Sequence, residues 1–176
     1  MSKPRYSLNK NKYLLPPEQE SLEWLLQSHI EKSPRDCTLL LLALRTGARA
    51  SELLQINSKD INAYDQSVLI RGIKGSNDRE IPLHRDLFYR LQTLSIDSNT
   101  GRIFPISYNR LRQIWEFYRP TLKTFHCLRH TFAIGLYKKT KDIRLVQVAL
   151  GHRNIANTMI YADYVYSQQE LRRLIL

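Results

Sequence analysis

Residues 35–56 read RDCTLLLLALRTGARASELLQI, and this stretch decides what kind of fold the chain can adopt. Its centre, residues 39–44, is apolar without interruption, which is typical of a helix buried on all sides. Gly47 follows, and glycine ends helices readily because it adopts the left-handed conformation without strain. The residues ARASELLQI then predict a second, short helix. We therefore expect a helical core built around one buried helix.

The flanking segments extend this prediction. Residues 15–30, LPPEQESLEWLLQSHI, open with prolines suited to a helix start and place leucines at helical spacing. Residues 60–83, DINAYDQSVLIRGIKGSNDREIPL, alternate short β-rich runs with turn residues. They predict a small antiparallel sheet of two or three strands, with KGSND (74–78) at the tip of the last hairpin. Further helices are predicted at 84–94, 108–117, 125–139, 143–150, 155–161 and 167–176. The predicted fold class is α+β, mainly α.

Composition limits the function. The chain has 176 residues, a net charge of +11 and a pI near 9.8. Residues 101–160 hold eleven Lys or Arg against two acidic residues, and residues 1–17 hold four basic residues and no acid. Such a distribution favours an acidic partner, most often nucleic acid, although a basic protein without such a partner remains an alternative. We expect residues 1–13 to form a flexible basic arm.

The cysteines and the apolar runs indicate a compartment. Cys37 and Cys127 each sit among apolar residues, so we expect reduced core cysteines and no disulfide framework. The N-terminus is polar and basic, which does not fit a signal peptide. The longest apolar run, CTLLLLAL, is too short to span a membrane. We expect a cytoplasmic protein.

Two stretches carry polar residues whose role is ambiguous when each is taken alone. Arg49 stands just past a predicted helix end, with Glu52 three residues later, and such a pair is ordinarily a surface ion pair. Lys74 lies beside the predicted hairpin turn, where a lysine is ordinarily solvated. Neither stretch predicts chemistry by itself.

The stretch FHCLRHTFAIGLY (125–137) is more informative. His126, Arg129 and His130 lie at i, i+3 and i+4 and share one face of a helix that otherwise looks buried. Burying three such groups is costly unless they are used. A zinc site is one alternative, but the metalloprotease motif with histidines four apart needs Glu after the first, and Cys127 stands there.

The last stretch, LGHRNIANTMIYADY (150–164), places His152 after a helix end and Tyr161 nine residues later. A tyrosine hydroxyl has a pKa of about 10, so it needs help to act as a nucleophile. Guanidinium groups bind phosphate oxygens with a planar set of donors, and histidine and lysine carry protons. No motif pairs carboxylates to hold magnesium, so cationic side chains would have to neutralise a transition state.

Four motifs in order, TGARASELL, IKGSNDREIPL, HCLRHTFA and LGHRNIANTMIY, resemble the tyrosine recombinase (phage integrase) family from Leu14 to Tyr166. The resemblance implies that family's catalytic-domain fold, with a three-stranded antiparallel sheet. It implies a compact member in which the catalytic domain covers residues 14–166, followed by a tail helix at 167–176. The implied activity is site-specific DNA recombination through a 3′-phosphotyrosyl intermediate.

The resemblance also implies which residues bind the scissile phosphate. Arg49 and Arg129 would clamp its non-bridging oxygens, with Glu52 supporting the site. His152 would hydrogen-bond the phosphate. His130, which follows the second arginine, is expected to be structural.

The same resemblance implies the groups that move protons and bonds. Tyr161 would be the nucleophile and His126 the general base that takes its proton. Lys74 would protonate the leaving 5′ oxygen. Tyr164 and Tyr166 are rival nucleophiles on local sequence, but their distance from LGH does not match the family.

The expected partners are double-stranded DNA and further copies of the chain, which would form a tetramer on paired sites. The resemblance also allows an accessory DNA-bending protein. No cofactor and no metal is expected. The predicted DNA-binding residues are basic side chains of the arm and of the 125–139 helix: Lys3, Arg5, Lys10, Lys12, Lys138 and Lys139.

Two other classes of function remain open at this point. One is a DNA-binding regulator that keeps the fold without turnover. The other is a metal-dependent nuclease. A covalent protein–DNA adduct distinguishes the first from a recombinase, and EDTA distinguishes the second.

Overall fold

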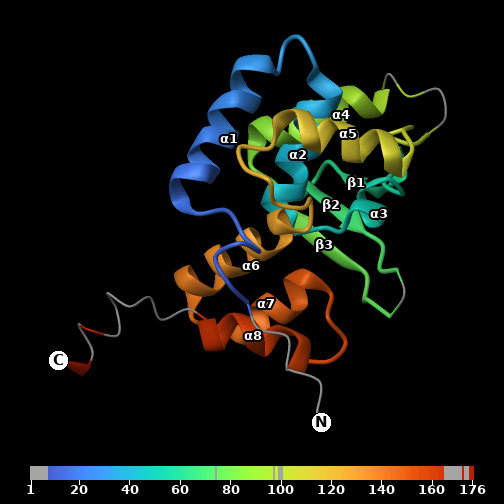
Figure 1. Cartoon of the computed structure of the whole chain (residues 1–176). Helices are drawn as coiled ribbons and strands as arrows, with labels where there is room; N and C mark the ends of the chain where they lie inside the picture. Colours follow the sequence, from blue (N-terminus) through green and yellow to red (C-terminus); the bar gives the residue numbers. More distant parts are fainter. Residues whose placement is uncertain (1–7, 74, 97, 99–100, 165–171, 173–174) are drawn as a thin grey trace.

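The computed structural model of the chain is mainly helical with one small sheet, as the sequence predicts (Figure 1). It describes residues 8–73, 75–96, 98, 101–164, 172 and 175–176. The first half holds α1 (Pro16–His29), α2 (Pro34–Thr46), α3 (Ala50–Leu53), a 3₁₀ turn (Ser58–Asp60), β1 (Ile61–Asn62), β2 (Ser67–Ile70) and β3 (Arg79–Pro82). The second half holds α4 (Arg85–Ile96), α5 (Tyr108–Tyr118), α6 (Cys127–Thr140), α7 (Ile143–Leu150) and α8 (Ala156–Tyr164).

Helix α2 lies at the centre of the larger hydrophobic core. Leu39, Leu40 and Leu42 are fully buried, and α2 packs against α1, α4 and α6. Burial on several sides removes water from apolar surface, which is the main favourable term in folding. The prediction of a buried helix is therefore confirmed. Cys37 and Cys127 are free and buried in the same core, also as predicted.

Gly47 ends α2 in the left-handed conformation, with φ of 62°, and its N–H donates to the carbonyl oxygen of Ala43. A Cβ atom at this position would lie 2.5 Å from Cδ1 of Phe132 in α6. Glycine is therefore required both by the backbone conformation and by the close approach of α6. The turn directs the chain to Arg49, which caps the start of α3.

The sheet has the order β1–β2–β3, and both pairs are antiparallel. Val68 of β2 pairs with Ile61 on one side and Ile81 on the other. The predicted hairpin tip lies between β2 and β3 and bends back to the end of α7. There the N–H of Asn77 donates to the carbonyl oxygen of Gly151 at 2.8 Å, and Ser76 forms a bridge with His152.

A second cluster of buried residues joins α6, α7 and α8 below the main core in Figure 1. It contains Leu8, and the N–H of Leu14 donates to Oγ1 of Thr131 in α6 at 2.8 Å. Within the predicted arm, Leu8 is buried in this cluster and Tyr13 packs on it, while residues 9–11 between them are exposed. Residues 1–7 lie outside the described part of the chain.

The remaining differences from the sequence prediction are small. Helix α8 extends to Tyr164, beyond the predicted end at Tyr161. Most of the predicted tail helix, 167–176, lies outside the described residues.

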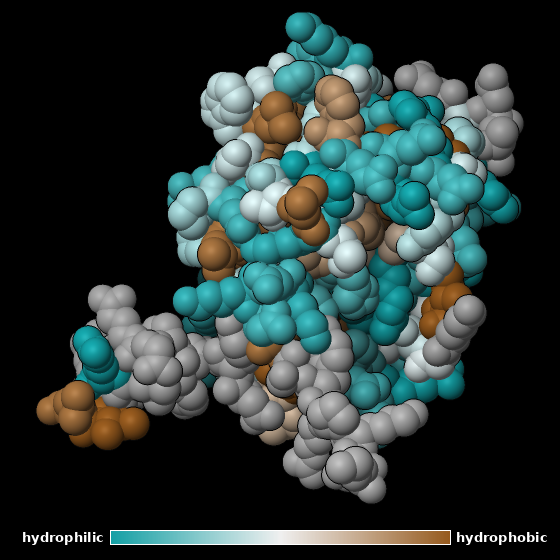
Figure 2. All heavy atoms as spheres, viewed as in Figure 1, coloured by the Kyte–Doolittle hydropathy of each residue, from teal (hydrophilic) through white to brown (hydrophobic). Residues whose placement is uncertain are grey.

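The face shown in Figure 2 is mainly hydrophilic, with separated apolar side chains. Among the described residues, no helix is both long enough and apolar enough to cross a membrane.

Replacing Gly47 with alanine should destabilise the protein. The left-handed backbone alone costs a non-glycine residue about 1–3 kcal/mol, and Phe132 and Leu150 crowd the new methyl group. Gly135→Ala is the matched control, because a Cβ there meets nothing within 4 Å and α6 should gain about 0.5–1 kcal/mol. Denaturant unfolding measures both changes. Equal stability of the two variants would contradict the proposed role of Gly47.

Candidate active site

A single buried carboxylate, that of Glu52, joins three arginines from separate elements. It accepts hydrogen bonds from the backbone N–H and Nη1 of Arg49, at 2.8 and 3.1 Å. It also accepts two from Arg79, the closer at 2.8 Å, and its Oε2 lies 3.9 Å from Nη1 of Arg129. Burial by itself would raise the pKa of Glu52, but the hydrogen bonds and charge of Arg79 outweigh it and the pKa is lowered.

Arg129 is fixed in the first turn of α6 by two backbone carbonyl groups. Its Nη1 donates to the oxygen of Gly47 at 2.7 Å, and its Nη2 donates to the oxygen of Leu150 at 2.8 Å. Burial lowers its pKa to about 9, helped by Arg49 and Arg79, so it stays cationic at neutral pH. Three guanidinium groups around one carboxylate leave an excess of two positive charges, which favours an anion.

Arg79 was not predicted as a site residue from the sequence. It begins β3, its side chain is buried, and its Nε has no hydrogen-bond partner in the structure. The available signal was strand alternation, since Arg79 and Ile81 share one face of β3. The sequence does not show that this face meets Glu52, so nothing in it distinguishes Arg79 from other basic residues.

Three histidines surround the arginines. Desolvation, with nearby positive charge, lowers the pKa of His126 and of His152 to about 4 and that of His130 to about 3. All three are therefore neutral at pH 7. His126 and His130 pack edge to face, with ring centres 4.8 Å apart. His152 follows α7, and its Nδ1 contacts Oγ1 of Thr158 in α8 at 2.9 Å.

Tyr161 lies on the buried face of α8, with only 2% of its surface exposed. Its hydroxyl lies 2.9 Å from Nδ1 of His130. Tyr161 also interacts electrostatically with Arg129, which places it near the arginine cluster. The structure thus brings Arg49, Glu52, Arg129 and Tyr161 into one region.

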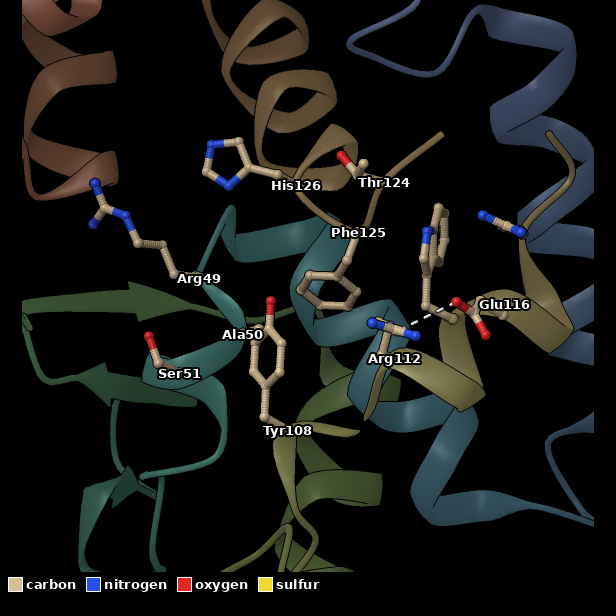
Figure 3. A pocket seen from close by; sticks show the side chains of 11 residues that line it. Arg49, Ala50, Ser51, Tyr108, Arg112, Glu116, Thr124, Phe125 and His126 are labelled. Carbon is tan, nitrogen blue, oxygen red and sulfur yellow. Dashed lines mark ion pairs between the residues drawn. The ribbon is translucent and has the colours of Figure 1, made fainter. Parts of the chain in front are cut away.

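A pocket of about 410 Å³ opens beside the cluster (Figure 3). Arg49 and His126 lie at one end of it, and an ion pair between Arg112 and Glu116 lies at the other. The ring of His126 packs on His130, which desolvates it in part, although the residue as a whole is exposed and lines the open pocket. The remaining lining residues are Ala50, Ser51, Tyr108, Trp115, Arg119, Thr124 and Phe125.

The other predicted residues lie apart from the cluster or outside the described chain. Three of them lie outside the described residues: Lys3, Arg5 and Lys74. Lys10 precedes α1 and is exposed. The pKa of His130 is lowered mainly by desolvation, then by His126 and Arg129, and Lys12 makes a smaller contribution of the same sign. The exposed lysines of α6 stand in its last turn: Lys138 and Lys139.

That last turn is about 13–15 Å along the helix axis from Arg129, given 1.5 Å per residue. Within the described residues, no group of three or more His, Cys, Asp or Glu side chains could hold a metal ion.

The model of the phage integrase family matches residues 18–168. The chain belongs to the phage integrase family. Among its relatives, tyrosine recombinase XerA of Pyrococcus horikoshii is 31% identical over 72% of this chain and 50% of its own length. Tyrosine recombinase XerC of Staphylococcus aureus is 30% identical over 95% of this chain and 62% of its own length. The chain thus spans roughly half to three-fifths of these family members.

Solved structures of phage integrase family relatives share the fold. The XerH site-specific recombinase bound to palindromic difH substrate, in a post-cleavage complex, superposes with a TM-score of 0.75. It is 25% identical, and the match covers 95% of this chain and 54% of that one. The XerA recombinase gives a TM-score of 0.71 at 24% identity, over 97% of this chain and 65% of that one.

The three neutral histidines make a prediction about pH. A histidine in the unfolded chain has a pKa near 6.5, whereas the folded chain holds these three near 3–4. The unfolded state therefore binds more protons as pH falls below about 7, and stability must fall with it. The melting temperature of this phage integrase family member should be lower at pH 5.5 than at pH 7.5.

The variant His152→Asn tests the cause of this fall. Asparagine keeps a polar atom near Thr158 but does not titrate, so the drop between the two pH values should be smaller. An unchanged or larger drop in the variant would show that His152 does not contribute.

Proposed function

We propose that the chain is the catalytic domain of a site-specific DNA recombinase that cleaves and rejoins strands through a 3′-phosphotyrosyl intermediate. The observation that carries the proposal is the buried hydroxyl of Tyr161 beside an arginine cluster with excess positive charge. A phosphodiester is the anion that such a cluster suits, because guanidinium donors match its oxygens. The net charge of +11 favours the same substrate.

In this proposal the arginines bind the non-bridging oxygens of the scissile phosphate. Arg49 lines the open pocket, and Arg129 is buried and held by two carbonyl groups. Glu52 and Arg79 keep both guanidinium groups in place, and His152 adds a hydrogen bond to the phosphate. Preorganised charge of this kind stabilises a transition state without later rearrangement.

The chemical step exchanges one phosphate ester for another. The oxygen of Tyr161 forms a bond to phosphorus while the bond from phosphorus to the 5′ oxygen breaks. His126 receives the phenolic proton, and Lys74 gives a proton to the leaving 5′ oxygen. Because the phosphate is a diester both before and after the step, attack by a 5′ hydroxyl reverses the step and seals the strand without ATP. Lys74 lies outside the described residues, and its role rests on the resemblance of IKGSNDREIPL to the family's motif.

Contacts along the DNA would come from the basic residues on either side of the site. Lys10 and Lys12 precede α1, and Lys138 and Lys139 are exposed at the end of α6. Lys3 and Arg5 extend the same basic run in sequence. Each phosphate contact releases a counterion, so binding should weaken steeply as salt rises. The solved XerH complexes with difH substrate support DNA as the partner.

We also propose that four copies assemble on two DNA sites, with the residues after Tyr166 binding a neighbouring copy. Leu145 and Val148 share a face of α7 and are 42% and 59% exposed, although both are apolar. An amphipathic tail helix would cover such a face, and it is too short to be stable alone. An accessory DNA-bending protein is an additional expected partner on longer sites.

The variant Tyr161→Phe tests the proposed chemistry. It should bind DNA nearly as well as wild type, since phosphate contacts dominate affinity, and it should form no covalent adduct on a denaturing gel.

Wild-type cleavage should persist in EDTA, because Arg49 and Arg129 supply the positive charge. An adduct that persists in Tyr161→Phe and disappears in Tyr164→Phe would move the nucleophile. Activity lost in EDTA and restored by magnesium or zinc would indicate a metal-dependent nuclease instead.

Deleting residues 167–176 tests the assembly. The shortened chain should still bind one DNA site, because the basic residues that contact DNA remain. It should fail to recombine two sites, and native gels should show no tetramer on paired sites. Normal recombination by the shortened chain would exclude the tail as the element of assembly.

A further inference from the structure

The hydroxyl of Tyr161 meets a histidine that the assigned roles leave unused. Nδ1 of His130 lies 2.9 Å from the hydroxyl oxygen, and the ring centres are 5.8 Å apart. Both residues are buried, at 5% and 2% exposure. A buried hydroxyl and a buried imidazole are each costly to desolvate unless they are paired, so the pairing is a specific feature of the fold.

We infer that His130 is a positioning residue for the nucleophile: its Nδ1 accepts the hydrogen bond of the Tyr161 hydroxyl and fixes that oxygen relative to the arginine cluster. The inference rests on the proposed function and adds a role that the sequence did not predict, since there His130 was expected to be structural. It concerns alignment of the attacking oxygen before the chemical step; when the step begins, the hydroxyl proton leaves Nδ1 of His130 and passes to His126, which accepts it as proposed.

The first turn of α6 is rigid enough for such a role. Arg129 is held by carbonyl groups on α2 and α7, and Thr131 bonds both to Cys127 within the helix and to the chain before α1. His130 stands between these two residues. The distance from the phosphate-binding guanidinium to the hydroxyl is thus set within one short, well-anchored segment.

Helix α8 needs such an anchor. Of its inward face, Thr158 and Tyr161 are buried, while Met159 between them is 40% exposed. The contact from Thr158 to His152 fixes one end of this face, and the contact from Tyr161 to His130 fixes the next turn. Apolar packing of the phenol ring does not by itself specify where its oxygen points, whereas a hydrogen bond to Nδ1 of His130 does.

The charge state of His130 suits the role of acceptor. Desolvation, together with His126 and Arg129, lowers its pKa to about 3, so the ring is neutral and one nitrogen keeps a lone pair. When the tyrosine hydrogen points to Nδ1, the oxygen lone pairs point elsewhere and stay available to attack phosphorus. His126, by contrast, is exposed at the start of α6 and lines the pocket with Arg49.

Two substitutions separate positioning from packing. His130→Asn places an amide oxygen where Nδ1 stood, and His130→Phe keeps a ring without an acceptor. We expect the Phe variant to form adduct about 100-fold more slowly, as a misplaced reacting atom does, and the Asn variant to recover most of the rate. Melting temperature and DNA affinity are measured for both. If the Phe variant does not fold, His130→Leu replaces it.

A second substrate makes the test specific to the nucleophile. When the bridging 5′ oxygen is replaced by sulfur, the leaving group needs no acid, so Lys74→Ala should recover. The Phe variant should keep its defect, because His130 acts on the attacking oxygen. A folded Phe variant that cleaves at the wild-type rate, or an Asn variant as slow as Phe, would overturn the inference. Adduct formation by Tyr161→Phe would instead overturn the proposed function, whatever the His130 variants do.

Discussion

The site depends on one carboxylate that three guanidinium groups share. Glu52 is buried where α3, β3 and α6 meet, and its carboxylate lies within hydrogen-bond or ion-pair distance of one arginine at each of these elements. A buried charge is tolerated only when it is paired and hydrogen-bonded, so the fold must bring all three elements to this point. The pairing is incomplete by design, because one negative charge cannot neutralise three positive ones. The remaining positive charge favours the binding of a phosphate.

The site is built from contacts between residues that lie far apart in the sequence. Arg129 bonds to Gly47, 82 residues away, and Arg79 bonds to Glu52 at a separation of 27. These contacts join the end of α2 to α6 and join α3 to β3. The catalytic groups are therefore a product of the complete core rather than of any one motif. This is consistent with the weakness of each motif when it is considered alone.

Much of the fold could be predicted from the sequence, for identifiable reasons. Uninterrupted apolar residues predicted the burial of α2, Gly47 predicted its end, and turn residues predicted the hairpin. The order of the four motifs, through the family resemblance, predicted that Arg49, Arg129 and Tyr161 lie in one site. Arg79 and the contact of His130 with Tyr161 could not be predicted, since both depend on which side chain faces which across separate elements. The packing of Leu8 was missed because a basic composition conceals a single buried leucine.

The hairpin between β2 and β3 sets a limit on how the length of this chain could vary in evolution. Surface loops usually tolerate insertions and deletions. Here Gly72 bonds to the side chain of Asp78, and Asn77 bonds to Gly151, so both sides of the hairpin are anchored. A residue gained or lost on the far side of Ser76 would shift the strand that carries Arg79 out of register. Insertions and deletions that leave the arginine cluster intact should therefore be confined to positions 73–75, and there they must still retain Lys74, the proposed acid.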